Sequence, residues 1–152
     1  MKLSKNFSID ELTHSDTAIR LGLDNSPTPE QLDCLQELVT YVLQPVRDQF
    51  GLVAISSGLR GEAVNKAVGG SLTSDHCHGR AADFEVVGVD NKAVAMWIAE
   101  NLQFKQLILE FYDDGVTNSG WIHCSVDMSN NKKQKLTAQK DGKRTVYDVA
   151  TF

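Results

Sequence analysis

The chain has 152 residues, of which 41% are hydrophobic and 23% are charged, and its formal net charge is -5. This length fits one folded domain over residues 1–152, and the acidic balance argues against a nucleic-acid-binding protein, which usually carries a basic surface. No apolar stretch reaches the ~20 residues of a membrane span, and three cysteines (Cys34, Cys77 and Cys124) are too few for a disulfide scaffold.

The first third of the chain predicts helices. Residues 5–24 form an N-terminal segment in which Ser8-Ile-Asp-Glu11 has the pattern of a capping box. Thr28-Pro29-Glu30-Gln31 places proline at a first helical position, where its missing N–H costs nothing. Apolar residues then recur at intervals of three and four, which predicts a long amphipathic helix towards Phe50. Pro45 lies inside this pattern, and we expect it to kink the helix or to end it early.

Beyond residue 50 the pattern changes to short apolar runs typical of strands. It predicts strands at 52–57, 81–87, 106–111 and 121–126, a brief helix at 61–68, and a longer helix from Asp90 or Asn91 to Leu102. The lysine-rich stretch from Asn130 to Arg144 predicts a solvated hairpin that turns at Asp141-Gly142. Since helices come first and strands mostly later, with few βαβ units, we expect an α+β fold: helices packed on a small antiparallel or mixed sheet.

Ionisable side chains concentrate between Ser74 and Asp83, where two imidazoles, a thiol and two carboxylates fall within ten residues. A further histidine, His123, lies in the predicted strand 121–126, on the same face as Trp121 and Ser125. A histidine buried there needs a partner, because an unpaired buried polar group costs ~1–3 kcal/mol. Zinc accepts imidazole and carboxylate ligands. The spacing alone also fits a core histidine bonded to a carbonyl and a solvated histidine-rich turn.

These residues carry a resemblance to a known family. Ser74-x-His76-x-x-Gly79-x-Ala81-x-Asp83 matches the S-x-H-x-x-G-x-A-x-D signature of the zinc D-alanyl-D-alanine peptidases, the M15 metallopeptidases, and Trp121-Ile-His123 resembles their W-x-H segment. Upstream, Ser56-Ser57-Gly58-Leu59-Arg60 is similar to their S-G-[YF]-R stretch. Asn6 to Arg20 and the Pro45-Val-Arg47 region resemble the small single-domain, often phage-encoded, branch. The resemblance implies a fold of the Hedgehog/DD-peptidase type.

The resemblance also implies site residues. His76, Asp83 and His123 would be the ligands of one Zn²⁺ ion per chain, and Arg60 would bind a substrate carboxylate, a task that suits its planar charged fork. Ser74 would lie at the edge of the cleft, where it contacts the substrate or supports the metal loop; a hydroxyl that stabilises the turn is the alternative. We interpret His78 as a residue lining the cleft or supporting the ligands, and Cys77 as a packed thiol.

The general base departs from the family pattern. Many relatives carry an acidic residue three positions before the last histidine, where this chain has Gly120. Glu110, at the end of the predicted strand 106–111, would face the metal site if that strand pairs with 121–126. Asp113 and Asp114 are closer in sequence but resemble exposed turn residues. Glu110 is therefore the predicted catalytic base, and the two aspartates, a base elsewhere and a protein without catalysis are the alternatives.

The function implied is a zinc metallopeptidase that hydrolyses peptidoglycan stem peptides, as a D-Ala-D-Ala carboxypeptidase or an L-alanyl-D-glutamate endopeptidase, in cell-wall lysis. The alternatives are an inactive zinc-containing wall-binding or structural module of the same fold, and a small interaction domain with structural histidines. No secretory signal is visible at the start of the chain. We therefore expect cytoplasmic synthesis and action on the wall after phage-type release or as a virion component, as a monomer.

Overall fold

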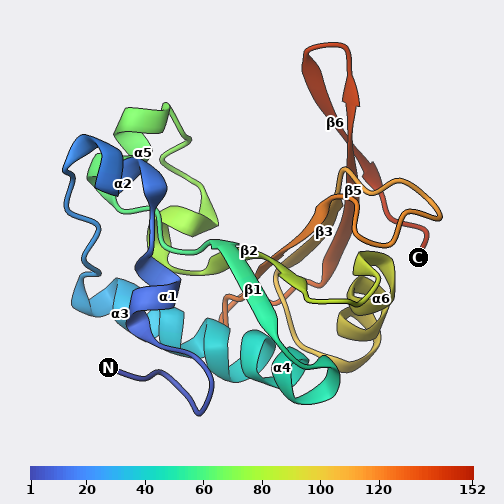
Figure 1. Ribbon diagram of the computed structural model, residues 1–152, viewed down its shortest axis with the longest axis horizontal. Coiled ribbons are helices and arrows are strands. Elements are labelled where there is room, and N and C mark those ends of the chain that lie inside the picture. The colour runs from blue at the N-terminus through green and yellow to red at the C-terminus, as the bar shows by residue number, and fades with distance from the viewer.

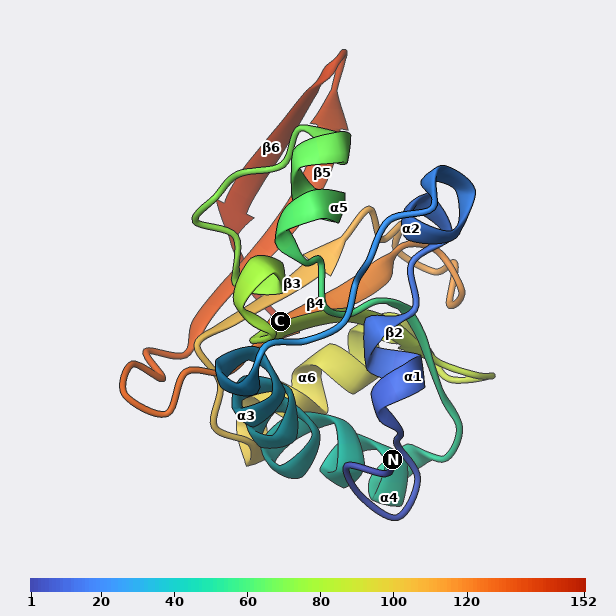
Figure 2. The same cartoon turned by 90° about the vertical axis from the view of Figure 1, so that its left-hand side faces the viewer.

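The computed structural model describes residues 1–152 and has a mixed α+β architecture (Figures 1 and 2). The helices are α1 Ile9–Thr13, α2 Asp16–Leu21, α3 Pro29–Leu38, α4 Gln44–Phe50, α5 Glu62–Val68 and α6 Asn91–Asn101. The strands are β1 Val53–Ser57, β2 Ala81–Val86, β3 Gln106–Glu110, β4 Trp121–Ser125, β5 Gln134–Asp141 and β6 Arg144–Val149. The α+β prediction is confirmed. None of the helices combines the length and apolarity needed to cross a bilayer.

The predicted long helix runs without a break to Phe50, through a π-helical turn at Val39–Leu43 that joins α3 to α4. In this turn the backbone N–H of Gln44 donates to the carbonyl of Val39, five residues back. A proline lacks an N–H and its ring crowds the preceding turn of a helix. The wider π turn directly before Pro45 accommodates both effects. The expectation that Pro45 ends the helix early was therefore wrong.

The six strands form one mixed sheet in the order β1-β2-β4-β3-β5-β6. Every neighbouring pair is antiparallel except β3 and β5, which run parallel. The hairpin predicted at 130–144 is present, but its arms span 134–149 and it projects from the body of the molecule (Figure 1). It reaches further along the chain than predicted because its second arm pairs with β5 over residues 144–149.

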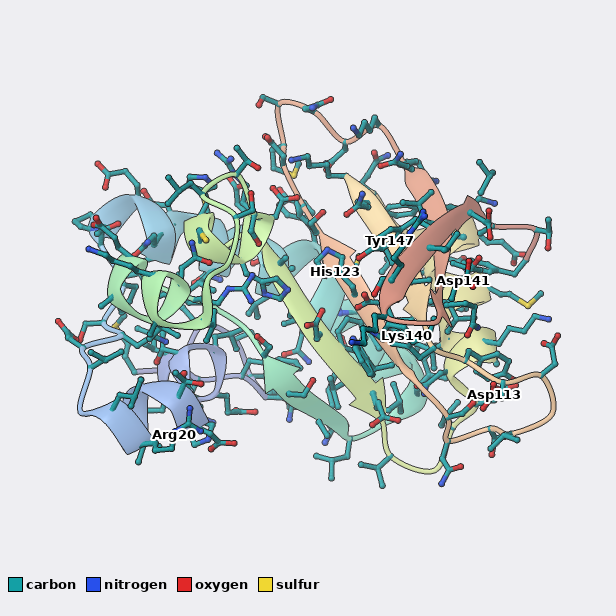
Figure 3. The ribbon with its side chains drawn as sticks, turned by 90° about the horizontal axis from the view of Figure 1, so that it is seen from above. Arg20, Asp113, His123, Lys140, Asp141 and Tyr147 are labelled. Carbon is teal, nitrogen blue, oxygen red and sulfur yellow. The ribbon has the colours of Figure 1, made fainter.

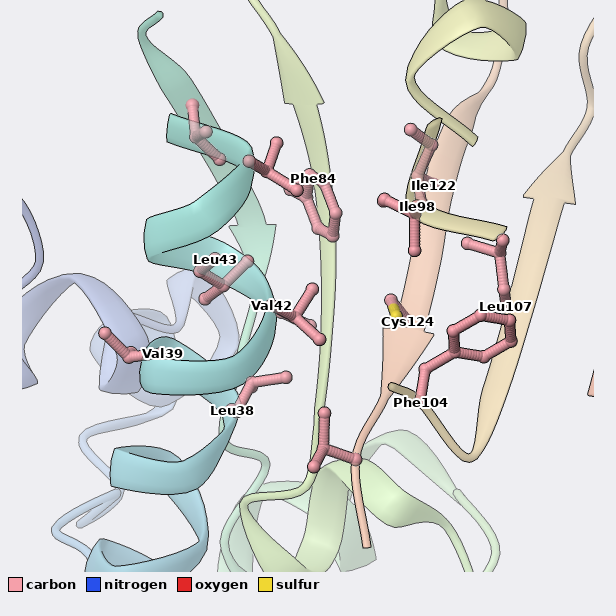
Figure 4. Packing of buried hydrophobic residues seen from close by; sticks show 14 of the residues in the cluster. Leu38, Val39, Val42, Leu43, Phe84, Ile98, Phe104, Leu107, Ile122 and Cys124 are labelled. Carbon is pink, nitrogen blue, oxygen red and sulfur yellow. The ribbon is translucent and has the colours of Figure 1, made fainter. Parts of the chain in front are cut away.

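The hydrophobic core lies between one face of the sheet and the helices α3, α4 and α6 (Figure 4). Alternate strand residues such as Phe84, Ile122 and Cys124 are fully buried there, against Leu43 and Ile98 from the helices. Fully burying one such aliphatic or aromatic side chain stabilises the fold by ~1.5–3 kcal/mol. Because side chains alternate along a strand, the intervening residues point to the opposite face of the sheet. That face carries the ionisable residues described next.

Candidate active site

Strand pairing brings the predicted site residues of three strands together on one face of the sheet. Asp83 on β2 lies opposite His123 on β4, and His123 in turn lies opposite Ile108 on β3. Glu110 at the end of β3 pairs with Trp121 at the start of β4. Directly opposed residues in an antiparallel pair have Cβ atoms ~4.5–5.5 Å apart. The pairing of β3 with β4 on which the Glu110 prediction depended is thus present.

His76 reaches the same place from outside the sheet, on a 3₁₀ turn at Asp75–His78. The hydroxyl of Ser74 accepts the His76 backbone N–H at the start of this turn, and Gly79 ends it with a φ of 74°. A Cβ atom at position 79 would stand 2.7 Å from the carbonyl oxygen of Gln31 on α3. The sharp bend predicted at Gly79 is confirmed. Because the segment is a turn and not extended, His78 points outward and is exposed, away from the cleft.

The side chains of His76, Asp83 and His123 form a compact group. Each offers a ligand atom, and these atoms all lie within 4.8 Å of one another. Asp83 Oδ1 lies 3.4 Å from His76 Nε2 and 2.9 Å from His123 Nδ1, and the two imidazole ring centres are 5.1 Å apart. His76 is buried, and the side chains of the other two are only 21% and 13% exposed.

The backbone fixes which nitrogen of His76 faces this group. Its Nδ1 lies 2.9 Å from the carbonyl oxygen of Gly58. A carbonyl can only accept, so Nδ1 carries the proton, and in the neutral ring Nε2 keeps its lone pair towards Asp83. Metal-binding histidines commonly donate their other ring N–H in this way. Two imidazole nitrogens and one carboxylate form a donor set that fits a metal ion such as zinc.

Charge interactions within the group shift its pKa values. Burial acts to raise the pKa of Asp83, but hydrogen bonds with His123 and His76 and their positive charges hold that pKa well below its usual value. For His76, burial acts to lower the pKa, and the hydrogen bond and charge of Asp83 more than compensate, so that its pKa is raised above 6.5. Asp83 is therefore an anion that attracts cations to this point.

Glu110 lies on the same cleft as the three predicted ligands. Its Oε2 accepts the indole N–H of Trp121 at 2.7 Å, which fixes the orientation of the carboxylate. Burial, followed by the negative charge of Asp83, raises the pKa of Glu110. Asp113 and Asp114 are exposed and lie outside the cleft.

Position 120 has no room for the acidic residue of many relatives. Gly120 has a φ of 64°, a conformation that side-chain-bearing residues rarely adopt. A Cβ atom there would overlap the carbonyl oxygen of Glu110 and stand 2.7 Å from the carbonyl carbon of Phe111. The absence of a side chain at Gly120 allows the end of β3 to approach the start of β4, and Glu110 is the carboxylate that lines this side of the cleft.

Arg60 lies at another edge of the cleft, after the end of β1. Its backbone N–H donates to the carbonyl of His76, which joins it to the 3₁₀ turn. Its Nη2 donates to the hydroxyl of Ser74 at 3.1 Å, and its Nε is buried without a hydrogen-bond partner. Ser74 itself is not among the residues that line the cleft. Its contacts are those of a hydroxyl that caps the turn and holds the arginine.

These residues surround a cleft of about 620 Å³. A family model for peptidase M15 matches residues 5–125. The chain belongs to the peptidase M15 family. This M15 peptidase is thus a metallopeptidase that acts on a peptide substrate. The enzymes of the M15 family depend on zinc. Among curated proteins, no relative matches the chain.

Four residues of the M15 peptidase line the cleft without having been predicted from sequence: Gln106, Ile108, Leu136 and Tyr147. The alternation of side chains along β3 could have identified the first two, because they share a face with Glu110. Leu136 and Tyr147 lie on the β5–β6 hairpin, and they reach the cleft only because β5 adds to β3 in parallel. Local sequence patterns carry no signal for such a pairing.

Proposed function

We propose that this M15 peptidase is a zinc-dependent enzyme that hydrolyses amide bonds in the stem peptides of peptidoglycan, in cell-wall lysis. The observation that carries the proposal is the convergence of His76, Asp83, His123 and Glu110 on one open cleft of an M15 chain. Three ligand atoms and a nearby carboxylate with a raised pKa are the parts that metal-assisted hydrolysis requires.

His76 through Nε2, His123 through Nδ1 and Asp83 through its carboxylate would hold the zinc ion. When bound, zinc supplies a Lewis acid that lowers the pKa of water and polarises a carbonyl group. Catalytic zinc sites commonly use three protein ligands and leave a further position open. The cleft in front of this group supplies the space in which a peptide can lie.

Glu110 acts as the general base in this proposal. Its carboxylate takes a proton from water as the water oxygen bonds to the carbonyl carbon of the scissile amide. The C–N bond then breaks, and Glu110 returns the proton to the leaving nitrogen. A positioned general base typically contributes 10²–10⁴-fold to the rate, and a pKa raised towards the working pH favours both transfers. Trp121 holds the carboxylate in place through its indole N–H.

Arg60 binds a carboxylate of the substrate and sets its register in the cleft. The guanidinium lines the cleft and its only side-chain hydrogen bond is the one from Nη2 to Ser74, so its remaining Nη N–H groups can donate to a carboxylate. The hydroxyl of Ser74 accepts a hydrogen bond from Nη2 and thereby holds the fork in position. A terminal carboxylate bound here corresponds to carboxypeptidase action on D-Ala-D-Ala. An internal carboxylate, as in D-glutamate, corresponds to endopeptidase action on L-Ala-D-Glu.

The test compares E110Q with wild type on purified muropeptides, with the products weighed by mass spectrometry. The amide oxygen of the introduced glutamine can still accept the Trp121 N–H, so we expect an intact fold, one zinc per chain and a loss in kcat of at least ~10²-fold. The control E100Q changes an exposed carboxylate on α6 and should leave kcat unchanged.

Each contrary result has its own meaning. Full activity of E110Q removes Glu110 from the mechanism. A wild type that binds zinc but cleaves no muropeptide identifies the chain as a zinc-containing wall-binding or structural module. The masses of the fragments distinguish the carboxypeptidase from the endopeptidase.

A further inference from the structure

The β5–β6 hairpin forms one wall of the active-site cleft, although it lies beyond the residues matched by the family model. That match ends at residue 125, whereas the hairpin spans 134–149. Leu136 on β5 and Tyr147 on β6 line the same cleft as the three predicted ligands and Glu110. Figure 3 labels Tyr147 on the hairpin and His123 in the sheet. This chain therefore builds part of its cleft from a segment outside the family-matched core.

The register of the sheet places Tyr147 in line with Glu110. Glu110 pairs with Ala138 across β3 and β5, and Ala138 pairs with Tyr147 across β5 and β6. Neighbouring strands lie ~4.8 Å apart, so the backbones at 110 and 147 are separated by roughly 10 Å. The only side chain between them in this row is the single methyl group of Ala138, which is fully buried. No bulky side chain of this row stands between Tyr147 and Glu110, and both residues line the same cleft.

The hydroxyl of Tyr147 is a hydrogen-bond donor that the fold leaves available. Tyr147 is 53% exposed, and no hydrogen bond within the protein engages its hydroxyl. Burial, and then the charges of Glu110 and Asp83, raise its pKa, so the phenol stays protonated at neutral pH. Gln106, the other uncharged donor lining the cleft, donates to Gln134 at 2.9 Å. Arg60 is held by Ser74 at a different edge.

We propose that Tyr147 donates a hydrogen bond to the carbonyl oxygen of the scissile amide and stabilises the negative charge that develops there during attack by water. This inference rests on the proposed peptidase function. A donor aimed at the site of developing charge acts on the transition state more than on bound substrate. It therefore raises kcat and leaves KM nearly unchanged. Tyr147 lies outside the residues that the family model matches, and the hairpin carries it into the cleft.

The test is Y147F, which removes one oxygen atom and keeps the aromatic ring. We expect kcat on a cleaved muropeptide to fall at least ~10-fold, with KM within about twofold of wild type and with zinc content and Tm unchanged. Y41F is the matched control, because Tyr41 is an exposed tyrosine of the π turn that lines no part of this cleft. It should match wild type in both constants.

A second measurement uses a phosphinic peptide, whose tetrahedral anionic group mimics the transition state. Its inhibition constant should rise at least ~10-fold in Y147F, while the KM for substrate stays constant. An unchanged kcat in Y147F, or a loss confined to KM, overturns the inference and leaves the peptidase function standing. A wild type that hydrolyses no muropeptide overturns the proposed function, and the inference with it.

Discussion

Asp83 is the residue on which the electrostatics of the site depend. A single carboxylate lies between two imidazoles, with Oδ1 at 2.9 Å from one ring and 3.4 Å from the other. Its negative charge raises the pKa of His76 despite the burial of that ring, and it contributes to the raised pKa of Glu110. One side chain thus attracts a cation and also tunes the predicted base.

This coupling predicts how the stability of the metal-free protein depends on pH. Because the pKa of His76 is higher in the folded than in the unfolded chain, its protonation stabilises the fold below pH 6.5. This contribution is lost as the pH rises through the pKa of the folded state. Because the pKa of Asp83 is lower in the folded than in the unfolded chain, its ionised form stabilises the fold above pH 3.8. This contribution is lost as the pH falls towards the pKa of the folded state. The free energy of unfolding, measured with urea in the presence of EDTA, should therefore be highest between about pH 3.8 and 6.5 and decrease at lower and at higher pH.

D83N provides the comparison. Without the carboxylate, burial outweighs the hydrogen bond with Gly58 and lowers the pKa of His76, so the decrease in unfolding free energy as the pH rises above 6.5 should disappear. A decrease of equal size in D83N and wild type would show that other groups cause it. D16N is the control, because Asp16 pairs only with the exposed His14, far along the chain from the cleft residues.

At the scale of elements, the 3₁₀ turn that carries His76 is held by close contact with α3. Gln31 on α3 donates through Nε2 to the carbonyl of Cys77 at 2.9 Å, and Leu35 packs beside Gly79. The turn therefore takes its position from a helix that contributes no ligand. The long helix predicted from its apolar spacing serves both as core and as the support of this turn.

G79A should weaken metal binding through this contact. A methyl group at position 79 would meet the Gln31 carbonyl at 2.7 Å, and a φ of 74° strains any residue with a side chain. The turn must move, and we expect zinc affinity, measured by competition with a chelator, to fall about tenfold. G69A is matched in backbone conformation, with a φ of 67° and no atom within 4 Å of the added methyl. Equal affinities in G79A and G69A would contradict the role of the α3 contact.

At the scale of the whole molecule, the sheet separates the hydrophobic core from the candidate active site. One face packs against α3, α4 and α6 and supplies most of the core, whereas the other face displays Asp83, His123 and Glu110. The predicted ligands come from the 3₁₀ turn and β2, which follow each other in the chain, and from β4, whose His123 lies 40 residues after Asp83. An ion held by all three ties these segments together only in the folded state.

Zinc should therefore raise the thermal stability. Binding to the folded state alone contributes ~2.7 kcal/mol at 100 times Kd, which for a chain of this size corresponds to roughly 5–11 °C in Tm. H123A should lose this shift, whereas H14A should keep it, because His14 is exposed and its side chain hydrogen-bonds only with Asp16. The measurement is differential scanning fluorimetry with zinc and with EDTA. An equal shift in both variants would contradict the assignment of His123 as a ligand.

The sequence by itself determined the parts that depend on neighbouring residues. Apolar spacing located the helix towards Phe50 and the strands of the site, and alternation placed His123 on the face opposite Ile122 and Cys124. The resemblance of Ser74 to Asp83 and of Trp121 to His123 to M15 motifs implied the predicted ligands, and Gly79 between His76 and Asp83 indicated a bend. These features follow from periodicity, turn chemistry and motif, which are local properties of a chain.

Only the tertiary structure decided the features that depend on which strands lie together. The parallel addition of β5 to β3 brings Leu136 and Tyr147 into the cleft, and the π turn carries the helix past Pro45. The close approach of Gly120 to the end of β3 explains why that position has no side chain. The physical reason is the same in each case: contacts between distant segments depend on packing and register, and no short stretch of sequence encodes them.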